Sequence, residues 1–413
     1  MRAVIIGAGL GGLLAGAFLA KNGYEVTILE KSPIIGGRFT NLPYKGFQLS
    51  TGALHMVPHG EDGPLAYLLK ILGAKVEIVN SDPKGKILWN GRIMHYREGW
   101  KFLGFKEKAK ALKLLAEIKA NRLPKGEEAL IPADEWIKEK VGDNEFTLKF
   151  LESFVGWADS VSLNEIPAIE LAKEIKAALM WGGPGLIRGG CKAVIDELSR
   201  IITENKGRII TRERAVEVEE GRVIGESGSE YQYDLLISNI GIKETVELVG
   251  EEEFPRDFLK EVDKIKPSEG VKFNLAVPGE PRIGNTVVFT PQLSINGFNE
   301  PSSLDQSLAK EGYTLIMAHM ALKESPKRAI KKGWNDILGV FPDGEPLLAQ
   351  VYRGNNPVNR TRAGVHVKWP LENIYVVGDG YRPMGGIEVD GIALGVMEVL
   401  ERIGIGNFKS WKL

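Results

Sequence analysis

Apolar and polar positions in the first thirty residues follow the order strand, turn, helix, strand. An apolar run covers residues 2–6, a helical stretch of small residues extends to Lys21, and a second apolar run covers residues 25–29. Glycines separate the first run from the helix, and an Asn-Gly turn separates the helix from the second run. This order predicts the opening β-α-β unit of a parallel sheet.

The glycine turn of this unit is typical of a dinucleotide site. Gly7 makes the tight turn, Gly9 lets the backbone approach a pyrophosphate, and Gly12 lets the helix pack closely on the strand. The free amides and positive end of the helix then face the phosphates. Glu30 ends the second strand, where its carboxylate accepts hydrogen bonds from both ribose hydroxyls and disfavours the 2′-phosphate of NADP.

The segment after Glu30 indicates which dinucleotide is bound. Five residues, 31–35, lead into Gly36-Gly37-Arg38. In a domain that binds only NAD, the chain would normally continue into the next helix of the sheet. Here a glycine-rich loop ends in a cation, and it can run back over the cofactor to place a guanidinium beside the pyrophosphate.

Two long stretches interrupt the pattern of the nucleotide-binding unit. The first begins with runs over 86–89 and 92–96 around an Asn-Gly pair, which predicts a β-hairpin. It continues with predicted helices over about 105–123 and 134–163. The second holds alternating or β-branched runs that predict an antiparallel sheet with helices on one side: residues 271–277, 286–290, 313–320 and 347–352.

The chain resembles the superfamily of FAD enzymes that includes phytoene desaturases, flavin amine oxidases and protoporphyrinogen oxidase. The resemblance begins with Glu30, the five-residue gap and Gly36-Gly37-Arg38. It recurs over residues 181–223, and again over 374–388 with a final helix behind it. A strand that ends in Ser-Asn at 238–239 resembles the phytoene desaturases within this superfamily, and the chain is most similar to short phytoene desaturase-like proteins.

The resemblance implies an α/β fold with a Rossmann-like FAD domain and a discontinuous α+β substrate domain. The FAD domain is expected over 1–60, 184–245 and 365–413, and the substrate domain over 61–183 and 246–364. The implied FAD-binding residues are Gly7, Gly9, Leu10, Gly11, Gly12, Glu30, Lys31, Gly37, Arg38, Val216, Gly378, Asp379, Gly386 and Ile387.

In the family, the backbone around Val216 contacts the adenine and Asp379 binds the ribityl chain. The start of the last helix faces the flavin, where a helix N-terminus stabilises the negative charge of the reduced ring. No cysteine lies near this motif, so FAD is expected to bind non-covalently. No metal site is predicted.

Four residues beside these motifs are candidates for the substrate pocket. His55 is a proton acceptor or polar anchor, or else structural, and Trp181 stacks beside the flavin or fills the core. Glu388 and Asp390 either cap the last helix or recognise a polar or cationic substrate. Because a flavin accepts the hydride, the chain need not supply a nucleophile.

Three functions agree with these motifs. The leading one is desaturation of an isoprenoid-like or other apolar small molecule by hydride transfer from C–H to flavin N5. The second is amine oxidation, with Glu388 and Asp390 contacting the ammonium. The third is a non-catalytic adenine-nucleotide-binding protein of the same fold. The sequence does not identify the electron acceptor.

Composition restricts the partners and the compartment. A formal net charge of −1 argues against nucleic acid as the main partner, and a single cysteine, Cys191, fits a reducing compartment. The apolar start is read as a core strand rather than a signal peptide, so a cytoplasmic protein is expected. Many Lys and Glu residues with one Cys also resemble a heat-adapted composition.

A basic stretch over 101–125 raises the question of membrane contact. It contains eight Lys or Arg residues against two Glu, interleaved with apolar positions. Such a helix can rest on an anionic bilayer, or it can pack its apolar stripe inward and solvate its lysines. The second interpretation is the favoured one, because most amphipathic helices do only that.

Overall fold

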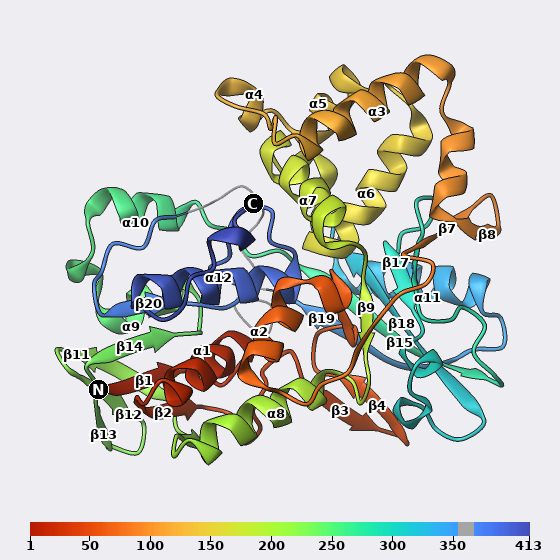
Figure 1. The fold of residues 1–413 in the computed structure, drawn as a ribbon. Helices are drawn as coiled ribbons and strands as arrows, with labels where there is room; N and C mark the ends of the chain where they lie inside the picture. The colour runs from red at the N-terminus through yellow and green to blue at the C-terminus, as the bar shows by residue number, and fades with distance from the viewer. Residues whose placement is uncertain (354–366) are drawn as a thin grey trace.

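The computed structural model describes residues 1–353 and 367–413. Figure 1 shows an α/β layer built on a parallel sheet, a second sheet beside it and a lobe of helices above. The first sheet is parallel and comprises β1 Arg2–Ile6, β2 Glu25–Glu30, β10 Arg208–Thr211, β14 Leu235–Ser238 and β20 Ile374–Val376. Its strand order is β10-β2-β1-β14-β20, so three separate segments of the chain build it.

Both faces of the parallel sheet are covered, because its central strand is apolar on each side. Ala3 and Ile5 pack against the helices, whereas Val4 and Ile6 pack against a small β-meander. The helices are α1 Leu10–Lys21, α2 Pro64–Leu72, α8 Cys191–Glu204 and α12 Glu388–Arg402. The meander is β11 Ala215–Glu219, β12 Arg222–Gly225 and β13 Glu230–Gln232. Two-sided burial explains why β1 has no polar alternation.

Close packing of α1 on β1 depends on glycine at position 12. A Cβ built on Gly12 would lie 2.2 Å from the carbonyl oxygen of Gly7, so the backbone would have to move. We expect Gly12→Ala to lower the free energy of unfolding by about 1–3 kcal/mol. Gly339, near the end of α11 Pro326–Val340, is the matched control because an added Cβ there meets nothing within 4 Å.

Chemical denaturation of the two variants and the parent protein measures this difference. Gly339→Ala is expected to stabilise the protein by about 0.5–1 kcal/mol, since alanine favours a helix interior. Equal effects of the two substitutions would contradict the packing argument for Gly12.

The second sheet has seven strands, and all but one of its pairings are antiparallel. Its order is β19-β15-β18-β17-β16-β7-β8. The strands are β7 Lys86–Trp89, β8 Arg92–His95, β15 Gly270–Pro278, β16 Val287–Phe289, β17 Gly297–Asn299, β18 Tyr313–Ala321 and β19 Glu345–Tyr352. The predicted hairpin and antiparallel sheet are therefore confirmed. The hairpin also joins the edge of this sheet, through a parallel pairing of β7 with β16.

The long central strand β15 has two faces of different character. Val271, Phe273 and Leu275 pack in a core with residues of α11. The intervening Lys272 and Asn274 are buried on the opposite face and make side-chain hydrogen bonds there. This alternation of period two places the Lys272 ammonium against the loop of residues 50–53 and the Asn274 side chain against β19.

The helical lobe comprises α3 Phe105–Lys119, α4 Glu127–Leu130, α5 Ala133–Lys140, α6 Glu145–Asp159 and α7 Ala168–Trp181. One continuous helix over 134–163 was expected, and this prediction is wrong. The chain breaks at Gly142, whose φ is 131°, and α6 restarts after Asn144, whose side chain accepts a hydrogen bond from the Thr147 amide. The α6 helix then ends at Asp159, and residues 163–165 form a separate 3-10 turn.

Shorter elements connect these layers. They are β3 Asn41–Tyr44, β4 Phe47–Ser50, β5 Met56–Val57, β6 Ile78–Asn80, β9 Gly185–Ile187, α9 Ile242–Val249 and α10 Arg256–Asp263. The domain boundaries expected from sequence remain a prediction, and the one at 364/365 lies outside the described residues.

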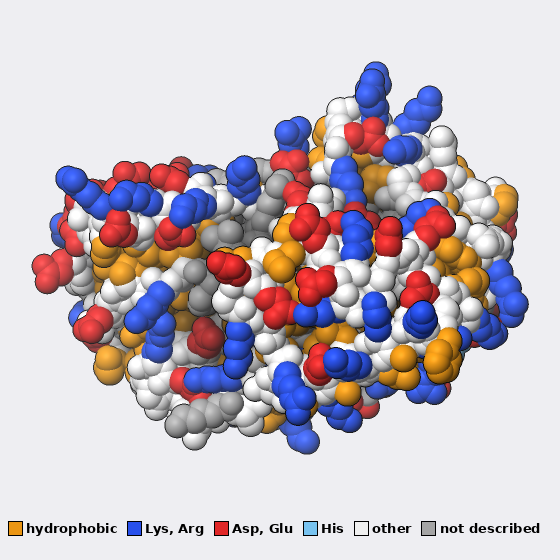
Figure 2. All heavy atoms as spheres, turned by 90° about the horizontal axis from the view of Figure 1, so that it is seen from above, with side chains coloured by type: hydrophobic (Ala, Val, Ile, Leu, Met, Phe, Trp, Pro, Cys, Tyr) orange, Lys and Arg blue, Asp and Glu red, His pale blue; other side chains and the backbone are white. Residues whose placement is uncertain are grey.

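Seen from above in Figure 2, cationic and anionic side chains are interspersed over the surface. Among the residues that the structure describes, no helix is long and apolar enough to cross a membrane.

Candidate functional site

The glycine turn lies where the carboxyl ends of β1, β14 and β20 meet. A Cβ on Gly9 would lie 2.7 Å from the Asn239 side-chain nitrogen, and one on Gly11 would lie 2.9 Å from the amide nitrogen of Gly378. The loops after β14 and β20 therefore press against the turn and require its glycines. Ligands of open α/β sheets bind at this type of crevice, outside the carboxyl ends of the strands.

Glu30 is held rigidly at the edge of this crevice. Glu30 is buried, with only 7% of its surface exposed. One carboxylate oxygen accepts a hydrogen bond from the Ala8 amide at 2.9 Å, and the other accepts one from the Ser32 amide at 2.8 Å. Each oxygen keeps a further lone pair, so the carboxylate can also accept hydrogen bonds from a ligand.

The loop of Gly36, Gly37 and Arg38 returns to the glycine turn, as its spacing predicts. Its two glycines have φ values of 99° and 55°, which favour glycine. The Gly36 amide donates to the Ala8 carbonyl at 2.7 Å. Arg38 forms an ion pair with Asp379 at 2.9 Å, so two predicted cofactor residues from opposite ends of the chain meet here.

A cleft of about 2000 Å³, including space open to solvent, runs over this region. Ten of the fourteen predicted cofactor residues line it: Gly7, Gly9, Leu10, Gly11, Glu30, Lys31, Gly37, Arg38, Val216 and Asp379. Four do not belong to its lining: Gly12, Gly378, Gly386 and Ile387. Gly12 and Gly378 instead allow close packing beside the cleft, since an added Cβ would meet the Gly7 carbonyl oxygen or the Asn239 side chain.

Several lining residues were not predicted from sequence. Asn239 follows β14, and its side-chain nitrogen Nδ2 donates a hydrogen bond to the Gly7 carbonyl at 3.3 Å. Thr51, Glu213, Glu244 and Glu247 also line the cleft. The one available signal was the Ser-Asn end of β14, because residues that follow neighbouring parallel strands meet at the same edge of the sheet.

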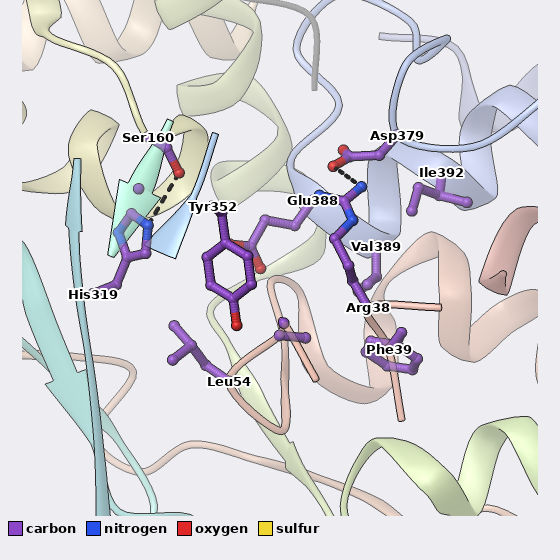
Figure 3. A pocket seen from close by; sticks show the side chains of 13 residues that line it. Arg38, Phe39, Leu54, Ser160, His319, Tyr352, Asp379, Glu388, Val389 and Ile392 are labelled. Carbon is purple, nitrogen blue, oxygen red and sulfur yellow. Dashed lines mark hydrogen bonds and ion pairs between the residues drawn. The ribbon is translucent and has the colours of Figure 1, made fainter. Parts of the chain in front are cut away.

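A cavity of about 670 Å³, also partly open, adjoins the cleft. Arg38, Phe39, Asp379 and Ile392 line both, so the two spaces lie next to each other. Most of the cavity surface is apolar, but four of the nine other lining residues are polar exceptions, which Figure 3 shows. These exceptions are Ser160, His319, Tyr352 and Glu388.

The four polar residues come from four different elements: α6, β18, β19 and α12. His319 on β18 is hydrogen-bonded to Ser160, the residue that ends α6, with 3.1 Å between Nε2 and Oγ. Gly270 leaves room for this imidazole, since a Cβ there would lie 2.6 Å from Nε2. Ser160 and Glu388 both have left-handed backbones, with φ values of 59° and 42°. Such conformations in non-glycine residues are often found at functional sites.

The floor of the cavity is the loop of residues 50–54, and the polar face of the second sheet holds it. The Lys272 ammonium donates to the Ser50 carbonyl and hydroxyl, both at 2.6 Å. Gln350 donates to the same carbonyl at 3.2 Å, and the Tyr352 hydroxyl donates to the Thr51 carbonyl at 3.1 Å. Burial lowers the pKa of Lys272 to about 7.

Of the four candidate pocket residues, Glu388 lines the cavity and the other three lie elsewhere. His55 accepts from the Cys191 amide at 3.0 Å and contacts the Gln48 carbonyl at 2.9 Å, and burial lowers its pKa to about 4.

Trp181 packs against His59 and Trp411. Asp390 accepts from the amides of His59 and Leu65, both at 2.9 Å, and so caps α2. These contacts give Trp181 and Asp390 structural roles. The hydrogen bonds of His55 give it a structural role as well.

A buried group of charges lies between the lobe and the loop before α12. Arg382 pairs with Asp159 at 2.6 Å and donates to the Gly386 carbonyl, and Glu170 accepts from the Gly385 amide at 2.9 Å. Burial raises the pKa of Glu170 to about 7. Burial and the neighbouring Asp159 raise the pKa of Glu174 well above its ordinary value.

This raised pKa predicts a pH-dependent effect of Glu174→Gln. The folded protein keeps a proton on Glu174 that the unfolded chain releases above about pH 4.5, so its burial costs stability increasingly as pH rises. Glutamine stays neutral and can still donate to Asp159. We expect the variant to be more stable than the parent at pH 8 by about 1–3 kcal/mol, and nearly equal to it at pH 4–5.

Urea unfolding at both pH values measures the effect of Glu174→Gln, with the exposed Glu220→Gln as control. A gain in stability of the same size at both pH values would contradict the explanation by the raised pKa of Glu174.

Comparisons with known proteins agree with this architecture. A family described as an NAD(P)-binding Rossmann-like domain matches residues 5–72. The crystal structure of the PF1083 protein from Pyrococcus furiosus is 68% identical, covers 100% of both chains and has a TM-score of 0.92. That of an oxidoreductase from Methanosarcina mazei is 39% identical over 97% of this chain and 100% of that one, with a TM-score of 0.89.

The uncharacterized protein MJ1488 of Methanocaldococcus jannaschii is 44% identical over 98% of this chain and 99% of its own length. A shorter match links the chain to a 4,4'-diapophytoene desaturase of Staphylococcus aureus, at 46% identity over 14% of this chain and 12% of that protein. Putrescine oxidase, at 14% identity and a TM-score of 0.74 over 98% of this chain and 99% of that one, shares the fold. The chain therefore belongs to the family of these Pyrococcus, Methanosarcina and Methanocaldococcus proteins, has a short stretch similar to a 4,4'-diapophytoene desaturase, and shares its fold with putrescine oxidase.

Proposed function

We propose that this protein is an FAD-dependent oxidoreductase that holds its cofactor non-covalently in the cleft. The observation that carries the proposal is that the cleft and the cavity adjoin each other. Glu30 and the glycine turn line the cleft, and the Arg38–Asp379 pair lies where the cleft meets a mainly apolar cavity. A redox cofactor that extends along the cleft would meet a small molecule in the cavity.

The residues of the cleft fit FAD chemically. The glycines form a cradle that any Cβ would fill, as the contacts at Gly9 and Gly11 show. Amides at the start of α1 and the Arg38 guanidinium would hold the pyrophosphate. Glu30 would accept hydrogen bonds from the ribose hydroxyls, and Asp379 from the ribityl chain. Lys31 and Val216 would flank the adenosine end of the cleft.

The substrate we propose is an isoprenoid-like or other apolar small molecule. When bound, FAD would supply a hydride acceptor at flavin N5 for a C–H bond of the substrate. Three apolar side chains of the cavity, Phe39, Leu54 and Val389, would exclude water and orient the substrate against the flavin ring. None of these roles requires a nucleophilic side chain.

Amine oxidation is the second candidate, and the position of Glu388 favours it. This carboxylate enters an otherwise mostly apolar cavity from the first residue of α12. A buried or half-buried carboxylate can hold an ammonium group as its partner. Anaerobic bleaching of the flavin separates the candidates, because polyenes reduce the flavin of a desaturase and amines reduce that of an amine oxidase.

The absorption spectrum of the purified protein, before and after incubation with FAD, tests the proposal. Mass spectrometry identifies whatever denaturation releases. A yellow protein that releases intact FAD would support non-covalent binding. A colourless protein that refuses FAD but releases an adenine nucleotide would overturn the proposal in favour of a binding role.

A further inference from the structure

The α3 helix carries two apolar stripes on opposite faces, and one of them faces solvent. The inner stripe contains Leu114 and Ile118, which are buried in the core of the helical lobe. The outer stripe consists of Phe105, Ala109, Leu112 and Ala116, whose i, i+4, i+7, i+11 spacing places them on one line of the helix. Phe105 is 88% exposed and Leu112 is 59% exposed. An ordinary surface helix has only the inner stripe.

Lysines border the outer stripe on both sides. At 100° per residue, Lys106 and Lys113 lie on one flank, and Lys108 and Lys119 lie on the other. In Figure 2, cationic side chains project outward from the lobe that carries α3. The outer surface of this helix is therefore an apolar strip between two rows of positive charge.

The two acidic residues of α3 lie away from the outer stripe. Glu107 accepts hydrogen bonds from the Gly104 amide at 2.7 Å and the Asn144 side chain at 3.1 Å, on the inner side of the helix. Glu117 lies 3.8 Å from Lys113 and beyond it around the helix. Glu117 therefore offsets part of the charge of Lys113, and neither acidic side chain lies on the stripe itself.

We propose that α3 docks this protein on the surface of an anionic lipid bilayer. Phe105 and Leu112 would enter the boundary between headgroups and acyl chains, and the flanking lysines would contact the anionic headgroups. Lysine suits this position because its alkyl stem lies along apolar surface while its ammonium reaches the headgroups. A second copy of the chain fits less well, because a two-fold contact would bring the lysine rows together.

Co-sedimentation with lipid vesicles tests the docking in about 0.1 M salt, where charges act over about 10 Å. The parent protein is expected to pellet with phosphatidylglycerol vesicles and to stay in solution with phosphatidylcholine vesicles. The double variant Phe105→Ser/Leu112→Ser is expected to bind phosphatidylglycerol vesicles at least tenfold more weakly, about 1.4 kcal/mol. Lys106→Glu/Lys113→Glu is expected to do the same.

The matched control is Ile71→Ser, which removes a 43% exposed apolar side chain from α2. It is expected to bind like the parent, and thermal unfolding checks that all variants remain folded. Failure of the parent to pellet with phosphatidylglycerol vesicles would overturn the proposal, as would equal loss of binding in the control. A dimer that the double variant loses, with no vesicle binding by the parent, would assign the stripe to a second copy instead.

Discussion

Replacing Glu30 with alanine is expected to weaken FAD binding by tenfold or more, a loss of about 1.4 kcal/mol. The carboxylate would accept hydrogen bonds from the ribose hydroxyls, and it also accepts them from the backbone amides of Ala8 and Ser32. Its loss removes ligand contacts and releases the glycine turn on which the pyrophosphate would rest. Arg38→Ala is expected to have an effect of the same size, because it removes a cation from the cleft and leaves Asp379 without this partner.

Fluorescence titration of the apoprotein with FAD measures both affinities. Glu25→Ala is the matched control, since it removes a carboxylate from the exposed start of the same strand, β2. Its affinity for FAD is expected to equal that of the parent. Unchanged affinity in both Glu30→Ala and Arg38→Ala would refute the assignment of the cleft to FAD.

Replacing Arg382 with leucine is expected to destabilise the protein by about 3–5 kcal/mol at pH 8. The guanidinium is almost fully buried and is paired with Asp159. Without it, the carboxyl groups of Asp159, Glu170 and Glu174 would share a low-dielectric site that has lost its buried cation. These groups would respond by holding protons, so their pKa values would rise further.

The destabilisation is therefore expected to be smaller at pH 5, where the carboxyl groups are protonated more easily in both states. Urea denaturation at pH 5 and pH 8 measures the difference. Arg282→Leu, which breaks an exposed pair with Asp343, is the control and is expected to cost at most about 1 kcal/mol. A small, pH-independent effect of Arg382→Leu would show that the buried pair contributes little.

Local patterns predicted those parts of the fold that depend on neighbouring residues. The β-α-β unit, the hairpin and the strands of the second sheet follow from apolar periodicity and turn residues over short stretches. The parallel pairing of β7 with β16 does not, because it joins residues about 200 positions apart. The break between α5 and α6 had signals in Gly142 and Asn144, but the apolar positions on both sides continue with helical spacing.

The cleft was more accessible to prediction than the cavity for a physical reason. Glycine, an acid and a cation at fixed spacings describe a dinucleotide site, because the backbone itself binds much of the ligand. The cavity is lined by side chains from elements far apart in the chain. His319 lies in a strand whose residues are mostly buried on both faces, and Ser160 became recognisable only where α6 ends.

The hydrogen bonds that hold the loop of residues 50–54 beneath the cavity also determine which of its side chains can be replaced. Lys272, Gln350 and Tyr352 hold the loop of residues 50–54 mainly through its main-chain carbonyls. Every amino acid provides such a carbonyl, so the side chain of Ala53 can be exchanged while the loop keeps its place. Gly52 cannot vary in the same way, because an added Cβ would lie 2.8 Å from the Arg38 carbonyl oxygen. The floor of the pocket can thus diversify at Ala53 while the framework that supports it stays unchanged.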